Sequence, residues 1–347
     1  MAFAGRSAFP IALSLSFLVF VPPGYSQDRA GRTYETGQTD ASRLGLRTLA
    51  RTIPPVDLPV QAAAQRRISA SVRASLRILG QPPEGGPYGD ARDECKTTLS
   101  KFDWRDHGGV TAVRDQGACG SCFVFGSMGA FEGSWRIVNK QEIDTSEQQM
   151  LDCAKAGSCS GGWHAGVFNF ARDKGVASET AIPYSGKASG VCRVVAGPNY
   201  SAVNWEYIDG QGAKPPVADI KRALCEHGPV VSAVLATDDF LNYTSGIFNE
   251  NAQGSDPSNV NHDIAIVGWD DDEQVWIIKN SWKANWGEKG FMRIKYDSNN
   301  IGYAAAWVDA AKAGIPLATI RSVTQTAIRH LPAGDRRSLL ELRLLPR

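Results

Sequence analysis

The sequence predicts an α+β fold, with a helical part followed along the chain by a strand-rich part. A broad apolar helical face follows Cys122 and is formed at helical spacing by Phe123, Val124, Met128, Phe131, Trp135 and Val138. Two strand-like apolar runs come much later, at 264–269 and 275–279. Helices and strands that are segregated in this way are typical of α+β proteins.

Composition narrows the class of protein. The 347 residues have a mass of 37.4 kDa, enough for two or three domains with a sizeable core. With 43% hydrophobic and 21% charged residues, the chain is neither disordered throughout, collagenous nor a coiled coil. A net charge of +1 argues against a nucleic-acid-binding protein, although it conceals an acidic centre (95–310) and a basic tail (311–347).

The N-terminus has the layout of a secretory signal peptide, residues 1–26. A short head with Arg6 precedes an apolar run from Phe9 to Val21, and Pro22-Pro23-Gly24 then breaks the helix before a cleavage site near Ser26. A membrane anchor is the alternative, but the run is shorter than the roughly 20 residues needed to span a bilayer. We therefore expect a secreted protein, in an extracellular, periplasmic or lysosome-like compartment.

Residues 27–95 differ in composition from the rest of the chain. They begin as a polar stretch that closes in an extended, proline-rich segment at 53–59, which cannot be helical. From Val60 to Leu79 the spacing predicts one amphipathic helix, with its apolar positions at Ile68, Val72, Leu76 and Leu79. A Pro/Gly linker follows at 81–87, and the packed domain, 96–310, begins after it.

The tail at 311–347 is basic and carries weak helical spacing at Ile320, Val323, Ile328 and Leu331. Three alternatives stay open for it: docking on the acidic domain, a second removable segment, or a disordered solvated tail.

Cys122 is the leading candidate for a nucleophile. It lies at the end of Gln116-Gly117-Ala118-Cys119-Gly120-Ser121-Cys122-Phe123 and at the start of the predicted helix. Unpaired N–H groups and the helix dipole favour a thiolate there. Gln116 lies six residues upstream on the same loop, where its amide could donate to an oxyanion beside the sulfur.

His262 is the candidate partner among the five histidines. Asn261-His262-Asp263 opens the strand-like run at 264–269, so this imidazole lies at the mouth of a buried strand. Asn280 follows the next run and could accept the second imidazole N–H, with Trp282 shielding that bond from water. Taken alone, His262 would be a strand cap and Asn280 a turn residue.

These three motifs, in this order, resemble those of the papain-like cysteine proteases, over about Phe102 to Val308. The intervals from Cys122 to His262 and Asn280 are 140 and 158 residues, near the spacing of that family. The resemblance implies a helical domain that carries Cys122, facing a β-barrel-like domain that carries His262 and Asn280 across a cleft. It also implies that Cys122 is the nucleophile, His262 its imidazolium partner, Asn280 the orienting residue and Gln116 the oxyanion donor.

The resemblance also assigns cysteines. It pairs Cys119 with Cys159, and Cys153 with Cys192. Cys95 and Cys225 have no family counterpart; we predict a third bridge between them, the alternative being a buried, reduced Cys225.

Substrate-binding positions follow by the same carry-over. Gly161 and Gly162 would pair with an extended substrate, and Asn261 and Trp282 would flank the catalytic groups. The pocket for the second residue before the scissile bond would be lined by Trp163, His164, Ala233 and Val260. We expect this pocket to prefer large apolar side chains; the alternative is that Asp309 lies at its base and admits a basic side chain.

The resemblance thus implies a cysteine endopeptidase made as a zymogen, with residues 27–95 as an inhibitory propeptide. We expect protein or peptide substrates, a monomer, no nucleic-acid or membrane partner, no cofactor and no metal. Three alternatives are a redox dithiol at Cys119 and Cys122, a zinc site from these two with Cys153 and Cys159, and a binding homologue without activity.

Overall fold

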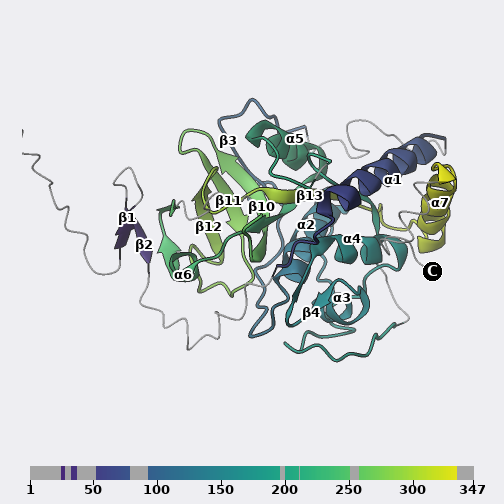
Figure 1. The fold of residues 1–347 in the computed structure, drawn as a ribbon, viewed down its shortest axis with the longest axis horizontal. Helices are drawn as coiled ribbons and strands as arrows, with labels where there is room; N and C mark the ends of the chain where they lie inside the picture. Colours follow the sequence, from purple (N-terminus) through teal and green to yellow (C-terminus); the bar gives the residue numbers. More distant parts are fainter. Residues whose placement is uncertain are drawn as a thin grey trace, which may run out of the picture.

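A computed structural model describes residues 52–78, 93–195, 200–210, 212–250 and 258–333, with the backbone of two short strands, β1 (Tyr25–Gln27) and β2 (Thr33–Thr36). Residues 1–24 of the expected signal peptide, the linker at 81–87 and the tail from 334 onward lie outside the described residues. A group of helices lies beside a large sheet, and two more helices, α1 and α7, pack together on the outside (Figure 1). The expected α+β class is confirmed.

The main sheet has eight strands in the order β6-β13-β7-β10-β11-β12-β9, with β3 paired to β10. Neighbours are antiparallel except β12 and β9. Their bounds are β3 (Lys101–Asp103), β6 (Ala202–Tyr207), β7 (Val230–Val234), β9 (Ile247–Phe248), β10 (His262–Asp270), β11 (Val275–Lys279), β12 (Phe291–Lys295) and β13 (Tyr303–Ala310).

The two strands expected from sequence are β10 and β11, which are direct neighbours. Residues 262–269 of β10 are all buried, because α2 covers this central strand and other strands flank it. Ala265 pairs with Lys279 in antiparallel register. The start of β10 and the end of β11 therefore meet at one edge of the sheet, which brings His262 next to Asn280.

Helix α2 (Cys122–Asn139) is the central helix and packs against β10 and β13. Nearly all of its residues are buried, in agreement with the broad apolar face of the sequence. Gly126 permits the close approach to β10, because a Cβ there would lie 3.2 Å from Asp263. The helix ends at Lys140, which adopts the left-handed conformation typical of helix C-termini.

The rest of the helical part supports the segment before α2. It contains α3 (Glu147–Cys153), α4 (His164–Asp173) and a small hairpin of β4 (Gly157–Ser158) and β5 (Gly161–Gly162). The Ser146 hydroxyl caps α3 by accepting from the Gln149 N–H at 3.0 Å. Apolar side chains of α2 and α4 share one core with β6, β7 and β13.

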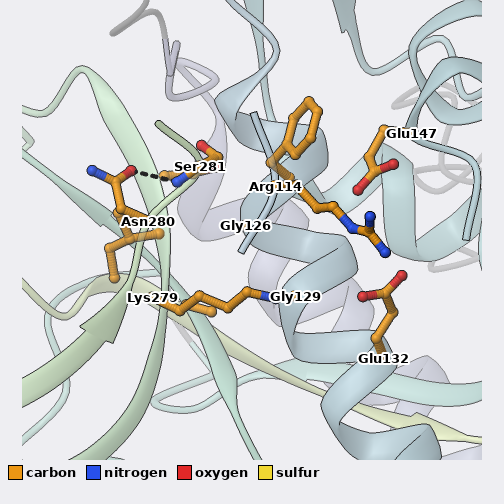
Figure 2. Close-up of a pocket in the computed structure, with 12 residues that line it drawn as sticks. Arg114, Gly126, Gly129, Glu132, Glu147, Lys279, Asn280 and Ser281 are labelled. Carbon is orange, nitrogen blue, oxygen red and sulfur yellow. Dashed lines mark hydrogen bonds between the residues drawn. The ribbon is translucent and has the colours of Figure 1, made fainter. Parts of the chain in front are cut away.

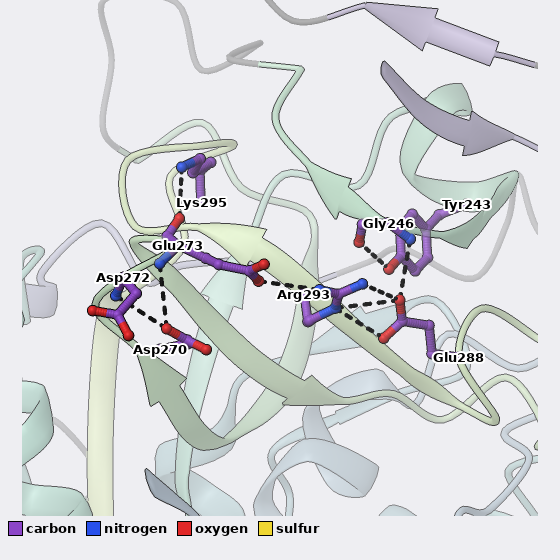
Figure 3. A network of polar contacts seen from close by, with 8 residues as sticks. All are labelled: Tyr243, Gly246, Asp270, Asp272, Glu273, Glu288, Arg293 and Lys295. Atoms are coloured by element: carbon purple, nitrogen blue, oxygen red, sulfur yellow. Dashed lines mark hydrogen bonds and ion pairs between the residues drawn. The ribbon is translucent and has the colours of Figure 1, made fainter. Parts of the chain in front are cut away.

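A polar network joins β12 to the residue that follows β8 (Tyr243–Ser245). Helices α5 (Val217–His227) and α6 (Asp238–Leu241) precede β8 in the chain. Figure 3 shows Arg293 between Glu273 and Glu288, with ion-pair distances of 3.1 and 2.9 Å. Glu288 also accepts from the Gly246 N–H at 3.1 Å. The N-terminal strand β2 pairs with β8.

Helices α1 (Leu58–Ile78) and α7 (Leu317–Arg329) share a separate apolar cluster. The predicted helix from Val60 to Leu79 corresponds to α1, which starts two residues earlier and ends one earlier. Of the three alternatives for the tail, the structure shows docking for the part that it describes, because α7 packs on α1 and α4.

Three disulfides join the pairs anticipated from the sequence: Cys95–Cys225, Cys119–Cys159 and Cys153–Cys192. Cys95 is buried in the main core with β10 and α5. The packed domain therefore includes Cys95, and a boundary after that residue would divide a bridged pair.

Candidate active site

Cys122 is the first residue of α2 and the one cysteine of the seven that is in no disulfide. The loop before it is held on one side by the Cys119–Cys159 bridge and by the Gly120 N–H, which donates to the Cys159 carbonyl at 2.9 Å. The thiol lies at the positive end of the helix, so the local field favours a thiolate. Since Cys119, Cys153 and Cys159 are disulfide-bonded, neither a Cys119–Cys122 dithiol nor the four-cysteine zinc site is formed.

His262 and Asn280 meet as the strand register requires. The His262 Nε2 lies 2.8 Å from the Asn280 Oδ1, which also accepts from the Ser281 N–H at 2.8 Å. The Oδ1 can only accept, so the Nε2 donates and the neutral ring keeps its lone pair on Nδ1. That Nδ1 is buried and has no hydrogen-bond partner among the described residues. It is the nitrogen left for a reacting group.

Trp282 covers this pair. Its ring stacks on the imidazole with centroids 4.5 Å apart and an interplanar angle of 25°. The stacking excludes water from the bond between His262 and Asn280. Burial lowers the pKa of His262 to about 4, while the Asn280 hydrogen bond and the nearby Asp263 carboxylate act to raise it. The imidazole is therefore neutral at pH 7 in this covered form.

Gln116 is held in one orientation beside Cys122. Its Oε1 accepts from the Ser281 hydroxyl at 2.6 Å and from the Trp282 indole N–H at 3.2 Å. Its Nε2 donates to the Cys119 carbonyl at 2.9 Å. The carbonyl end thus faces the His262 side of the site and the amide N–H₂ end faces the loop that carries the thiol.

The expected substrate positions fall in one region. Trp163, Ala233 and Val260 belong to a single apolar cluster, which also contains Ala306. Gly161 and Gly162 form β5, and the Asn261 carbonyl lies at the mouth of β10. Asn261 directly precedes His262, and Ala233 pairs with Asp263 in the register of β7 and β10.

The alternative that places Asp309 at the base of the pocket is wrong. Its carboxylate lies 2.8 Å from the Nδ1 of His227, at the end of α5, and it is not part of the apolar cluster. Side chains alternate along β13, so a residue three positions beyond Ala306 faces the other side of the strand. The pocket base therefore has no carboxylate from this residue.

His164 has no exposed surface in this form of the protein. Its Nδ1 lies 3.1 Å from the Asp263 Oδ2, and both side chains are fully buried. Sequence reasoning did not find this pair, although a polar residue directly after His262 at the head of an apolar strand was a usable signal. The pair places a carboxylate directly behind His262.

A segment from far upstream crosses the site. The Thr52 Oγ1 lies 3.4 Å from the Cys122 Sγ, and the Thr52 N–H donates to the Asn261 carbonyl at 2.7 Å. The Ile53 N–H donates to the Gly162 carbonyl at 3.0 Å, in a parallel bridge. The sequence predicted an extended segment here but gave no sign that Thr52 would contact the thiol.

A charged cluster lies behind Asn280 and Ser281. Figure 2 shows the Arg114 guanidinium between the carboxylates of Glu132 and Glu147. Burial, followed by the charge of Glu132, raises the pKa of Glu147 well above its usual value. These three side chains line a cavity with Asn280 and Ser281. Its volume is about 10 Å³, about enough for one water molecule. The Arg114 guanidinium also forms an ion pair with Asp144 at 2.5 Å.

Comparisons with known proteins agree with this geometry. Residues 98–310 match the model of the papain family cysteine proteases. Ananain from Ananas comosus is 34% identical over 222 residues, which are 62% of this chain and 61% of ananain. Pro-cathepsin H from Mus musculus is 35% identical over 213 residues, 59% of this chain and 63% of the relative. The chain thus matches less than two thirds of the length of these two proteins.

Solved structures extend the likeness. A Carica candamarcensis cysteine protease in complex with E-64 superposes with a TM-score of 0.54 and 32% identity, covering 61% of this chain and 98% of that one. The digestive procathepsin L2 proteinase of Tenebrio molitor has a TM-score of 0.61 and 26% identity, covering 80% and 84%. The match to a proform therefore includes more of this chain than the match to the inhibitor complex.

Proposed function

Since the chain belongs to the papain family of cysteine proteases, we propose that it is a secreted cysteine endopeptidase, made as a zymogen, that acts through Cys122 and His262. The observation that carries the proposal is the buried His262–Asn280 hydrogen bond of 2.8 Å, which leaves Nδ1 as the proton-accepting nitrogen. This orientation is what a thiol nucleophile needs from its base.

In the proposed reaction, the Cys122 thiol gives its proton to the His262 Nδ1 and the sulfur attacks a peptide carbonyl carbon. The peptide nitrogen then takes that proton from His262 as the C–N bond breaks. The product is a thioester on Cys122 and a free amine. Water then attacks the thioester, giving its proton to His262 and releasing the acid and the thiol. The Cys122 backbone N–H and the Gln116 amide stabilise the oxyanion in both steps.

Substrate recognition is proposed for strand β5, which contains Gly162. Its carbonyl already accepts a backbone N–H from Ile53, which supports β-type pairing with an extended peptide. The apolar cluster of Trp163, Ala233, Val260 and Ala306 favours a large apolar side chain in the adjacent pocket. With Asp309 outside that cluster, we expect no preference for a basic side chain.

Inhibition by residues preceding Cys95 is part of the proposal. Thr52 presents a hydroxyl to the thiol, and a hydroxyl offers no acyl group to attack. Two backbone bonds, to Asn261 and Gly162, hold the segment over the site. Processing between residues 79 and 94 would keep Cys95 and its bridge to Cys225 in the mature enzyme.

Export fits the three disulfides, which persist in oxidising compartments. In the part of the chain that the structure describes, no helix is long and apolar enough to span a bilayer. We propose a monomer that acts on proteins or peptides.

The test is irreversible labelling by an epoxide of the E-64 type, with mass spectrometry to locate the adduct. The processed protein is expected to be labelled at Cys122 and to hydrolyse a fluorogenic peptide with an apolar residue two positions before the scissile bond. The Cys122→Ser variant should do neither. A folded, processed protein that neither reacts nor cleaves would instead be a binding homologue without activity.

A further inference from the structure

Helix α1 contacts the rest of the protein through two different faces. One face is apolar: Ala64, Ile68 and Val72 follow one another at four-residue steps and are buried. They meet Val323, Ala327 and Leu331 of the C-terminal segment in one buried cluster. The Ser71 hydroxyl adds a hydrogen bond of 2.8 Å to the Ala327 carbonyl. Figure 1 shows α1 and α7 side by side at the edge of the molecule.

The other face of α1 is polar and lies on β6. The Gln65 Nε2 donates to the Trp205 carbonyl at 2.6 Å, and the Asn204 Nδ2 donates to the Ser69 hydroxyl at 2.9 Å. One turn further, the Arg73 guanidinium pairs with Glu206 at 3.2 Å. These directional contacts set the position of α1 along β6, and Leu58 and Ala62 at its start are buried in the core that β6 shares.

Helix α7 is attached to the protease domain independently of α1. Its Arg321 Nε donates to the Asp173 carbonyl at the end of α4, at 2.5 Å. Before α7, the Asn139 side chain exchanges hydrogen bonds with the backbone of Ala311 and Ala313 at 3.1 and 2.7 Å. The family model ends at residue 310, so α7 is an addition to the fold that the family shares.

The distance along the chain between α1 and the thiol is short. Thr52 precedes Leu58, the first residue of α1, by six residues. Such a segment spans at most roughly 20 Å, so an anchored α1 keeps Thr52 at a high effective concentration over Cys122. Loss of α1 from its site would leave the segment held by the two backbone bonds of Thr52 and Ile53 and by the contact of Thr52 with Cys122.

We propose that α7 and β6 together form a docking surface for α1, and that this surface keeps the propeptide bound over the cleft even after the chain is cut between residues 79 and 94. The proposal rests on the proposed function. The C-terminal extension is thus an anchor for the inhibitor, and activation requires release of α1 from α7 in addition to proteolysis.

The experiment uses the full chain with a site-specific protease sequence placed within residues 81–87. After cutting, Cys122 is titrated with the epoxide, and gel filtration shows whether the fragment that contains α1 stays with the protease. In the parent chain the fragment should co-elute and labelling should stay slow. Ala327→Asp puts a charge against Ile68 and Val72, so the fragment should separate and labelling should accelerate at least about tenfold.

Matched variants distinguish a loss of α1 docking from a general loss of folding. Ser322→Asp adds the same charge at an exposed position of α7 and should behave like the parent. Val323→Ala removes buried volume without a charge and should accelerate labelling by a few-fold, which covers the case that Ala327→Asp does not fold. Ile68→Asp approaches the same contact from α1, and its effect should not add to that of Ala327→Asp.

Equal labelling rates in all cut chains, with the α1 fragment bound equally well, would overturn the docking proposal. So would a fragment that separates from the cut parent chain. Failure of the proposed function would give a different result. The epoxide would then label no variant, including variants from which the α1 fragment has separated on gel filtration.

Discussion

Acid should uncover the cleft of the precursor, because the Thr52 N–H is bonded to the carbonyl of Asn261, next to the buried His262, and we expect release of that segment to let water reach the imidazole. The covered state holds the pKa of His262 at about 4, compared with an ordinary 6.5. When the segment around Thr52 lifts, water reaches the imidazole and its pKa returns towards the ordinary value. Because the pKa of His262 is lower in the covered state, neutral His262 stabilises that state above pH 6.5. This stabilisation of the covered state is lost as the pH falls from 6.5 towards 4.

The magnitude follows from the two pKa values. One unit of pKa difference corresponds to about 1.4 kcal/mol, so the covered state loses about 3 kcal/mol between pH 7 and pH 4. The open population should therefore rise by roughly two orders of magnitude over this range. The linkage has this sign because protons bind the open state more tightly.

Hydrogen exchange measures the opening directly at the two amides that hold the segment, Thr52 and Ile53. The precursor should carry Cys122→Ser, which prevents processing and removes the coupled thiol. After correction for intrinsic exchange rates, protection at both amides should fall by roughly a hundredfold from pH 7 to pH 4. In a matched precursor that also carries His262→Gln, this fall should be absent. Equal pH dependence in both precursors would refute the reasoning.

Three further variants test other parts of the account. Replacing both Cys95 and Cys225 by serine opens a bridge across 130 residues and should lower the free energy of unfolding by about 4–5 kcal/mol, measured by urea denaturation; an unchanged midpoint would contradict a structural role. Gln116→Ala should lower kcat by about 10²–10³ with little change in KM, and an effect on KM alone would argue against an oxyanion role. Asn280→Ala removes a hydrogen bond that raises the pKa of His262, so the alkaline limb of the kcat/KM profile should move to lower pH. The rate should fall roughly 10- to 100-fold. An alkaline limb at unchanged pH would show that Asn280 does not stabilise the protonated imidazole.

Much of the fold could be predicted because its local patterns are strong. The apolar face after Cys122 became α2, and the two apolar runs became the neighbouring strands β10 and β11. Once these strands pair in antiparallel register, the proximity of His262 and Asn280 follows from chain geometry alone. The limits of α1 were predicted to within two residues for the same reason.

Other features depend on contacts between distant segments and leave no local pattern. Thr52 reaches Cys122 across 70 residues, and the approach depends on where α1 docks. The resemblance suggested Asp309 for the base of the pocket, but its side chain lies on the face of β13 that is turned to His227. The burial of His164 against Asp263 likewise depends on the packing of α4 against β10.

The central claim is that Cys122 becomes acylated during turnover, and trapping the acyl-enzyme tests it most directly. Processed protein would be mixed with a slowly deacylating ester substrate, quenched in acid and digested for mass spectrometry. The account predicts one acyl group, on the peptide that contains Cys122, and its removal by hydroxylamine as expected for a thioester. Substrate turnover without an adduct on Cys122, or with the adduct on another residue, would contradict it.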